Sequence, residues 1–576
     1  MTALLLWAAA LVPGLIAYNV PPSPTLFNQA AALGLWGLAM AALAPACAQG
    51  VRAAVLRTGA LQIALLLVAL AALLSSAVGV LPWALSLSAA GLLVATMALA
   101  LGGAALRPTP ALLAAFFGAW VAAGVFNSAI AVVQVFAPNL ADGDWIARSG
   151  VAGRAVGNMR QPNHLATLLL WSAVAVVPLV ELGPLARTRA RRAAAVALMA
   201  FSVLGITLSG SRTGLVGIGV LALWGVFDTR LSRFSRGVLL AAPLLCAASW
   251  GFTAWWASLH AGHAIGAATR IGEGDLSASR FAIWRDTLGL IRAHPWLGVG
   301  FGEFNFAWSL TPFPQRPVAF FDHTHNLPLQ LAAELGLPLA LLVLALLAAA
   351  LWQAWRRSWA VTGDAGSALR AAFVMVLLMA LHSQLEYPLW YAHFLLPTAL
   401  VWGLCLGADA DPSARSSGGL GAGTSRWPMV VGGVMLVAAV VVLVDFYRVV
   451  IIFSPPAAAR PLEERIANGQ RSWFFAHHAD YAAATTAERP ADAMPAFARA
   501  PHHLLDTRLM VAWAEALAQT GDVDRARHLA ARLREFRNPN SDDFFAPCAD
   551  ATLQPRPFQC EPPRRAYDWR DFRHTP

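Results

Sequence analysis

The stretch FDHTHNLPLQLAAELG, residues 321–336, places His323 and His325 directly before a strongly apolar segment. Three polar side chains follow at intervals of four residues: Asn326, Gln330 and Glu334. In an α-helix this spacing puts the three side chains on one face. Polar groups are costly in hydrocarbon, so such a stripe on a spanning helix is expected to face protein or water. The stretch therefore predicts a polar site at the mouth of a membrane helix.

The composition places most of the chain in a membrane. Of 576 residues, 58% are hydrophobic and 12% are charged, with a mean hydropathy of +0.58. Ordinary soluble domains carry about 25% charged residues. These values exclude a soluble multidomain enzyme. They predict an all-α fold: a polytopic membrane helix bundle with a small soluble helical C-terminal domain.

The net charge is +10, and every basic residue is Arg. The lack of Lys excludes Schiff-base or Lys-nucleophile chemistry, and it leaves Arg, whose planar fork suits phosphate, to hold any phosphate group. The basic residues lie in short loops between apolar segments, where they set topology. The charge therefore indicates a lipid bilayer as partner and no nucleic acid.

Apolar runs predict about 13 spanning helices, since a span needs about 20 residues. The runs lie near residues 3–20, 27–47, 59–77, 80–104, 111–137, 163–183, 194–209, 213–228, 237–258, 326–352, 369–387, 390–408 and 428–450. Clusters of Arg orient them, because short cytoplasmic loops are enriched in basic residues. The clusters share one side if the N-terminus is cytoplasmic: Arg52 and Arg57; Arg187, Arg189, Arg191 and Arg192; Arg230, Arg233 and Arg236; Arg356 and Arg357.

Five regions follow from this topology. They are N-terminal transmembrane helices (1–137), central transmembrane helices with outer-face motifs (138–258), a long outer loop (259–325), C-terminal transmembrane helices (326–450) and an outer helical domain (451–576). Residues 509–535 are similar to one tetratricopeptide-type helical pair, although a generic helical hairpin fits as well. Cys548 and Cys560 lie in this domain and would form a disulfide only outside the cytoplasm.

Two motifs on the predicted outer side join transmembrane helices. The stretch GNMRQPNH at 157–164 enters a helix, and it offers hydrogen-bonding groups either as the lip of a site or as a helix cap: Asn158, Gln161, Asn163 and His164. The stretch LSGSRTG at 208–214 combines backbone N–H groups with Ser211 and Arg212. That set suits a phosphate at a helix N-terminus, while the simpler alternative is an Arg that reaches from the membrane surface to water.

Two further motifs lie on the same side. The segment SASRFAIWRD at 277–286 carries Arg280 and Arg285, which would also suit the solvated face of an amphipathic helix. The segment HSQLEYPLWY at 382–391 combines an aromatic belt with His382 and Glu386, which a belt does not explain. The glycines of 298–302 follow no predicted strand, so they indicate a tight turn and not a dinucleotide site.

Taken together, these motifs resemble the bacterial O-antigen ligase and polymerase superfamily, and within it the PglL-type protein O-oligosaccharyltransferases, or pilin glycosylation ligases. The stretches that carry the resemblance are GNMRQPNHLATLL (157–169), LSGSRTG (208–214), SRFAIWRDTL (279–288), HPWLGVGFGEF (294–304), HTHNLPLQLAAELG (323–336) and HSQLEYPLWYAHFLLP (382–397). The resemblance implies a GT-C-like glycosyltransferase of the bacterial inner membrane. It implies work at the periplasmic face without a metal or other cofactor.

The resemblance also implies partners and roles. The donor would be a glycan on undecaprenyl pyrophosphate, and the acceptor a Ser or Thr hydroxyl of pilin or another exported protein. The histidine before Asn, His325, would be the general base. Arg212 and Arg280 would hold the pyrophosphate, with Arg285 one helical turn away as a second possibility, and Ser211 beside them. The remaining polar residues are expected to support the site: Asn158, Gln161, Asn163, His164, His323, Asn326, Gln330, Glu334, His382 and Glu386.

Three alternatives stay open at this point. The same motifs fit an O-antigen ligase that acts on lipid A-core, or an O-antigen polymerase. A lipid-glycan transporter would instead place polar residues near mid-membrane in paired repeats. Finally, Asp142-Gly143-Asp144 has the Asp-x-Asp spacing of metal-dependent glycosyltransferases, but a plain polar loop is the favoured interpretation.

Overall fold

The structure, a computed structural model, describes residues 1–47, 50–260, 265, 276–318, 320–409 and 426–573. Part of the long loop predicted over 259–325 lies outside these residues, as do the side chains of Ser277 and Ala278. The described chain is helical or irregular, and its one isolated bridge joins Cys47 and Leu106. The predicted all-α fold is therefore confirmed.

Within the described residues, ten helices are long and apolar enough to cross a membrane. They are α2 (Leu26–Leu43), α3 (Val51–Ala77), α4 (Trp83–Ala105), α5 (Pro110–Phe136), α6 (Pro162–Glu181), α7 (Arg189–Ser209), α9 (Arg233–Leu259), α12 (Leu327–Ala360), α13 (Gly363–His382) and α15 (Trp427–Phe453). Three shorter apolar helices join them: α1 (Thr2–Leu15), α8 (Arg212–Phe227) and α14 (Ala392–Gly407). Each of the predicted apolar runs coincides with one of these helices. The protein is a polytopic helical membrane protein.

Helix α6 lies at the centre of the bundle. Every residue from Asn163 to Val180 is buried, because α5, α7, α8 and α13 pack around it. Elsewhere α2 packs against α15, and α4 packs against α14 and α3. Gly103 makes the α4–α14 contact close, since a Cβ there would lie 2.0 Å from the carbonyl oxygen of Leu400. The polar start of α6 is thus held inside protein.

Helix α12 is broken at Gly336, where φ is 75° and ψ is 163°. The apolar run 326–352 had predicted a continuous helix, and the break departs from that prediction. A turn over 295–300 lies against the break, and its N–H groups replace the lost helical hydrogen bonds. Val299 N–H donates to the carbonyl of Ala333 (2.8 Å), and Gly300 N–H donates to that of Glu334 (3.0 Å).

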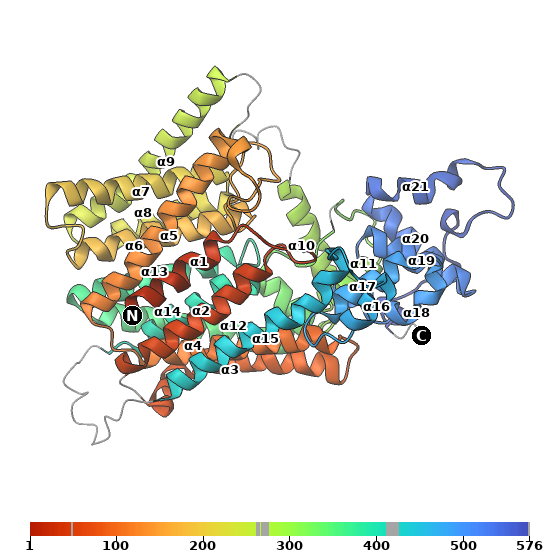
Figure 1. Ribbon diagram of the computed structural model, residues 1–576, viewed down its shortest axis with the longest axis horizontal. Helices are drawn as coiled ribbons and strands as arrows, with labels where there is room; N and C mark the ends of the chain where they lie inside the picture. Colours follow the sequence, from red (N-terminus) through yellow and green to blue (C-terminus); the bar gives the residue numbers. More distant parts are fainter. Residues whose placement is uncertain (48–49, 261–264, 266–275, 319, 410–425, 574–576) are drawn as a thin grey trace.

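The loop helices and the C-terminal helices form a lobe at one end of the bundle (Figure 1). They are α10 (Leu276–Ala293), α11 (Phe304–Leu310), α16 (Leu462–Gly469), α17 (Ala476–Thr486), α18 (Met494–Phe497), α19 (Thr507–Gln519), α20 (Val523–Phe536) and α21 (Asp542–Phe545). The predicted helical pair over 509–535 corresponds to α19 and α20, which pack together. A disulfide joins Cys548 to Cys560.

Short 3-10 helices complete the described chain. They are η1 (Ala44–Ala46), η2 (Pro138–Leu140), η4 (Pro388–Trp390), η6 (Pro490–Ala493), η7 (Ala500–His502), η8 (Pro539–Ser541), η9 (Ala546–Ala549), η10 (Phe558–Cys560) and η11 (Trp569–Phe572).

The C-terminal lobe is fastened to the loop that leads to His325. His502 Nδ1 lies 2.7 Å from Glu303 Oε2, and both side chains are buried. Asn305 bridges two segments, since its Nδ2 donates to the carbonyl of Phe321 and its Oδ1 accepts from Leu505 N–H, both at 2.8 Å. These contacts make the C-terminal helices and the loop that leads to His325 one packed unit.

Candidate functional site

The carboxylate of Glu386 lies at the centre of the site, in the turn that follows α13. Its Oε2 is 2.6 Å from His325 Nδ1. Its Oε1 accepts a hydrogen bond from Asn163 Nδ2 at 2.7 Å and pairs with Arg280. Only 5% of the Glu386 side chain is exposed. Burial alone would raise its pKa, but the hydrogen bond from His325 and the charges of His325 and Arg280 lower the pKa below its usual value. The group is therefore an ionised, fully engaged acceptor at neutral pH.

A hydrogen-bonded chain extends from Glu386 to the α7–α8 turn. Asn163, at the start of α6, links Glu386 to Ser211, because its Oδ1 accepts a hydrogen bond from Ser211 Oγ at 2.6 Å. Ser211 caps α8 through Gly214 N–H at 3.1 Å, as a serine at that position should. The next residue, Arg212, begins α8 and is exposed. The starts of α6 and α8 are thereby joined to the turn after α13.

His325 is held by its backbone as well as by Glu386. Its φ is 55°, an uncommon conformation for a residue other than glycine. The segment after it is paired with the segment before Glu386. Leu327 N–H donates to the carbonyl of Ser383 (2.8 Å), and Asn326 Nδ2 donates to that of Gln384 (3.0 Å). Residues in such uncommon backbone conformations occur often at active sites and ligand-binding sites.

Arg280 and Arg285 face in different directions. Arg280 lies four residues before Trp284, so the two share one face of α10. Trp284 Nε1 donates to the carbonyl of Thr324 at 2.9 Å, and Arg280 reaches Glu386 from the same face. Arg285 instead donates to the side chain and backbone carbonyls of Gln315, both at 2.7 Å. Of the two arginines, the structure brings Arg280 to the His325–Glu386 pair.

A buried layer of histidines lies beneath the carboxylate. His382, one turn before Glu386, has its Nδ1 2.7 Å from Thr167 Oγ1 of α6. The ring of His164 stands edge-on to those of His382 and Tyr391, with centroids 5.9 Å and 4.6 Å away. These side chains do not touch His325. They fill the space behind it with aromatic and polar groups.

His323 lies on the other flank. Its ring stacks on Tyr387 at 4.4 Å, and its Nδ1 is 3.1 Å from Asp322 Oδ1. Burial opposes ionisation of Asp322, but the charge and hydrogen bond of His323 and the charge of His325 lower its pKa to about 2. His323 is thus engaged with an aromatic wall and a carboxylate.

The polar stripe of α12 braces the loop. Asn326 caps the helix by accepting from Leu329 N–H at 3.0 Å. Gln330 accepts from Thr324 N–H at 2.8 Å and donates to Glu334 at 2.9 Å. The stripe therefore fixes the backbone on either side of His325.

Two residues of the 157–164 motif have local roles. Gln161 caps α6 by accepting from His164 N–H at 2.7 Å. Asn158 links three backbone groups of the loop region, those of Leu15, Trp145 and Ala147. The structure therefore does not bring Asn158 to the His325–Glu386 pair.

The Asp-x-Asp loop is organised by its own backbone. Asp142 Oδ1 accepts from the N–H groups of Asp144, Trp145 and Ile146 at 2.9–3.1 Å. These hydrogen bonds lower the pKa of the exposed Asp142 carboxyl. The arrangement is that of a capped polar turn.

Comparison with known proteins agrees with this arrangement of motifs. Residues 196–344 match the O-antigen ligase family, and residues 155–179 match a protein glycosylation ligase family. Residues 370–543 match the C-terminal region of virulence factor membrane-bound polymerases. A general O-oligosaccharyltransferase of Acinetobacter baylyi is 29% identical over 272 residues, which cover 46% of this chain and 45% of that protein. The chain resembles a PglL-type protein O-oligosaccharyltransferase of the O-antigen ligase superfamily. The resemblance predicted from the motifs is confirmed.

Each matched region of this ligase-like chain contributes to the site. Asn163 lies in the glycosylation-ligase region, Arg280 and His325 lie in the O-antigen ligase region, and Glu386 lies in the polymerase region. The alignment with the Acinetobacter protein spans less than half of either chain. The convergence of three matched regions on one carboxylate is a property of the tertiary structure.

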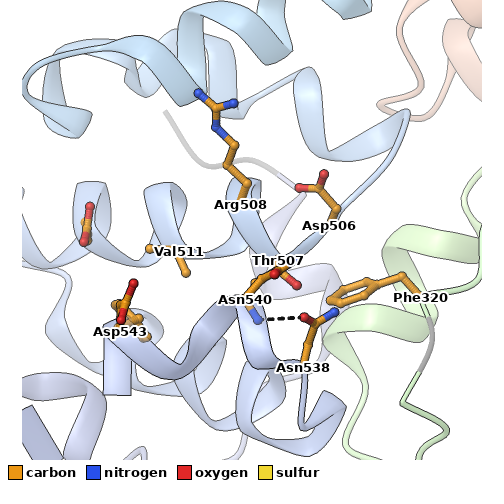
Figure 2. A pocket seen from close by; sticks show the side chains of 10 residues that line it. Phe320, Asp506, Thr507, Arg508, Val511, Asn538, Asn540 and Asp543 are labelled. Atoms are coloured by element: carbon orange, nitrogen blue, oxygen red, sulfur yellow. Dashed lines mark hydrogen bonds between the residues drawn. The ribbon is translucent and has the colours of Figure 1, made fainter. Parts of the chain in front are cut away.

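Two cavities lie near these elements. One of about 290 Å³ adjoins Ser211 and is otherwise walled mainly by apolar side chains of α7, α8 and α9, among them Leu215, Pro243 and Trp250. The other, of about 590 Å³, lies in the C-terminal lobe between Phe320 and α19 (Figure 2). It is lined by polar side chains such as Asp506, Arg508 and Asn540, and it does not include His325.

Some contributors to the site were not singled out in the sequence. Thr167 and Tyr387 lie inside the motifs at 157–169 and 382–397, but the sequence alone predicts no part for them in a site. Asp322 begins the loop that leads to His325. Thr167 lies one helical turn after Asn163, so its position on the buried face of α6 was the available signal. Tyr387 was interpreted as part of an aromatic belt, and its stacking on His323 depends on the fold.

Proposed function

We propose that the protein transfers a glycan en bloc from undecaprenyl pyrophosphate to a Ser or Thr hydroxyl of pilin or another exported protein. The observation that carries the proposal is that one buried carboxylate, that of Glu386, contacts both His325 and Arg280. A proton acceptor and a cation are thereby held beside each other. A hydroxyl that displaces a pyrophosphate needs both groups.

His325 acts as the general base. With Nδ1 directed at Glu386, the ring keeps Nε2 free to take the hydroxyl proton. The carboxylate orients the ring and stabilises the imidazolium that forms, as in other carboxylate–histidine pairs. The acceptor oxygen then bonds to C1 of the sugar, while the C1–oxygen bond to the pyrophosphate breaks.

Arg280 and Arg212 stabilise the leaving pyrophosphate, with Ser211 as an additional donor. Fixed cations lower the barrier where negative charge develops. Glu386 pairs with Arg280, which restrains the guanidinium while other N–H groups stay available. Arg212 begins α8, and an anion is favoured at a helix N-terminus. Arg285 is engaged with Gln315, so it is assigned a supporting role only.

The apolar cavity beside Ser211 would take the first isoprene units of the donor, those next to its pyrophosphate. That cavity of about 290 Å³ opens next to the α7–α8 turn. A lipid there would leave its pyrophosphate near Arg212. The apolar lining supports a hydrocarbon ligand, because such pockets are mostly hydrophobic with a few polar groups that orient the ligand.

The site faces the periplasm of a bacterial inner-membrane protein. The basic loops support a cytoplasmic N-terminus, which puts His325 and residues 451–576 on the outer side. The disulfide between Cys548 and Cys560 supports the same orientation, since disulfides persist in oxidising compartments. The five regions predicted from the sequence, from 1–137 to 451–576, are part of this proposal.

A second candidate function is O-antigen polymerisation or ligation to lipid A-core. The match of residues 370–543 to the C-terminal region of membrane-bound polymerases supports this second candidate. The same His325–Glu386–Arg280 chemistry would serve either acceptor. The acceptor therefore has to be identified by experiment.

The test is reconstitution with a lipid-linked glycan and either pilin or lipid A-core. Wild-type protein is expected to glycosylate pilin, and His325→Ala is expected to lower the rate at least about 10²-fold, as loss of a general base does. His260→Ala is a matched control at the residue directly after α9, where the ring stacks on Trp256. Full activity of His325→Ala would remove the proposed role. Glycosylation of lipid A-core alone would favour the second candidate.

The proposed chemical step needs no metal. We expect transfer to persist when the protein is stripped with EDTA and assayed at neutral pH. Abolished transfer that divalent ions restore would contradict a metal-independent step.

A further inference from the structure

Three histidines meet in the C-terminal lobe. His477 and His478 lie in the first turn of α17, and His503 follows η7. One ring nitrogen from each lies within 4.8 Å of those of the other two. The ring centroids of His503 are 4.1 Å from His477 and 5.0 Å from His478. Three imidazole nitrogens at these separations form a group that could hold one metal ion.

The cluster has the state that a metal site requires. Burial lowers the pKa of all three histidines, that of His503 to about 4, so the rings are neutral at neutral pH. His477 is 5% exposed, and its Nδ1 has no hydrogen-bond partner among the described residues. A buried nitrogen without a partner is costly in a native structure. A bound cation would satisfy it.

The two segments that carry the histidines are held together independently. Asp480 of α17 accepts two hydrogen bonds from Arg499, from Nε at 2.8 Å and from Nη2 at 2.7 Å. This bidentate pair lies three residues after His477 and four residues before His503. Such support fixes ligands in place before the metal arrives.

The turn before His477 is also anchored. Asp445, near the end of α15, accepts from Ser472 Oγ at 2.6 Å and from the N–H groups of Trp473 and Phe474. The start of α17 is thereby tied to a membrane helix. The three-histidine cluster is built on a rigid base and not on a free loop.

We propose that His477, His478 and His503 form a binding site for a divalent transition-metal ion of the zinc class. Imidazole is a preferred ligand of such ions, and it binds zinc at about 2.0–2.1 Å. Small rotations of the three side chains bring their nitrogens onto one ion. Three protein ligands leave a fourth position for water.

The site lies where the C-terminal lobe meets the loop that leads to His325. The charged groups that act on His503 are Asp322 and His323, and the Asp322 carboxylate favours a cation. Leu505 is linked through Asn305 to Phe321. The ion would hold α17 to the segment after η7, beside this loop. It takes no part in the transfer step proposed for His325, and the proposal holds whatever glycan acceptor is used.

The test uses the full-length protein in detergent, purified with a tag that contains no histidine. The protein is stripped with a chelator, and Zn²⁺ is titrated by calorimetry at neutral pH, with metal content measured after dialysis. We expect one ion per chain and a higher unfolding temperature when zinc is bound. Co²⁺ should give the visible absorption of a nitrogen-ligated ion of low coordination number. Absence of stoichiometric binding would overturn the proposal.

Variants separate this site from the other histidines of the chain. His503→Gln and His478→Gln keep polar side chains of similar size at half-buried positions, and each is expected to weaken zinc binding at least tenfold. His260→Ala is the matched control and should bind zinc as the wild type does. Where a variant fails to fold, the cobalt spectrum of the wild type decides. Unchanged affinity in both folded glutamine variants would refute the assignment.

Discussion

His325 and Glu386 lie 61 positions apart in the chain, yet the imidazole Nδ1 is 2.6 Å from the carboxylate Oε2. The contact joins the start of α12 to the turn after α13. Two backbone-directed hydrogen bonds beside it, from Leu327 and Asn326, hold the same two segments together. The pair is therefore a preorganised unit. Its disruption is expected to lower the transfer rate much more than the unfolding temperature.

Glu386→Gln tests the positioning role of the carboxylate. The amide keeps the shape but removes the charge that stabilises an imidazolium, and it can present an N–H to His325 and so favour the wrong tautomer. We expect the transfer rate to fall about 10²- to 10⁴-fold with a small change in unfolding temperature. Glu386→Asp should recover part of the rate. A glutamine variant with the wild-type pH–rate profile would show that the carboxylate only fills space.

Arg280→Lys and Arg285→Lys form a matched pair on one helix. Arg280 reaches the Glu386 carboxylate, whereas Arg285 is engaged with Gln315. Lys cannot reproduce a planar fork. We expect Arg280→Lys to lower transfer about 10²-fold, and Arg285→Lys to change it less than threefold, measured with a lipid-linked glycan under the same conditions. The reverse order would assign the pyrophosphate contact to Arg285.

Gly336→Ala tests the break in α12. The φ of 75° disfavours a side chain, and a Cβ would lie 2.3 Å from the carbonyl oxygen of Trp296. We expect destabilisation of about 1–3 kcal/mol, the usual strain at such positions, measured as a lower unfolding temperature. Gly433→Ala in α15, where a Cβ meets nothing within 4 Å, is the control and should change stability by at most about 0.5 kcal/mol. Equal effects in both would contradict the strain argument.

The stability of the C-terminal lobe should depend on pH through the three-histidine cluster. Histidines in an unfolded chain take up protons below about pH 6.5. The folded cluster resists protonation, since burial lowers the pKa of His503 to about 4 and also lowers the pKa values of His477 and His478 well below their usual value. The unfolded state then binds more protons, so stability is full above about pH 6.5 and falls as the pH drops toward 4.

The measurement is the unfolding temperature between pH 7.5 and pH 4 with a chelator present. The charges of Asp322 and His323 also change the pKa of His503. The same pH series on Asp322→Asn therefore shows how much of the pH dependence comes from the Asp322 charge. His477→Asn should flatten the profile. A wild-type unfolding temperature that stays constant or rises on acidification would contradict the prediction.

Much of the bundle could be predicted from local pattern. Each apolar run corresponds to an observed helix, because about 20 apolar residues have few alternatives in a bilayer. The spacing of Gln330 and Glu334 correctly predicted one helical face, and the two side chains are hydrogen-bonded to each other. The apolar pattern of α12 did not predict the break at Gly336. The turn that supports the break lies at residues 295–300, outside that pattern.

The candidate site was predictable in its residue types and not in its pairings. His325, Arg280 and Glu386 were each singled out in the sequence, but spacing alone could not choose between Arg280 and Arg285. That choice depends on which face of α10 meets Glu386, and Trp284 fixes the face through Thr324. The only sequence signals for the three-histidine cluster were two adjacent His-His pairs, His477-His478 and His502-His503.

The sequence by itself determined that this is a membrane bundle with polar motifs grouped at helix ends, because hydrophobicity and helical periodicity are local properties of a chain. Only the tertiary structure decided that His325, Arg280 and Asn163 share the Glu386 carboxylate, and that His503 meets His477 and His478. These contacts join residues from separate helices and loops. They form when the bundle and the lobe pack, and packing depends on the shapes of many distant side chains at once.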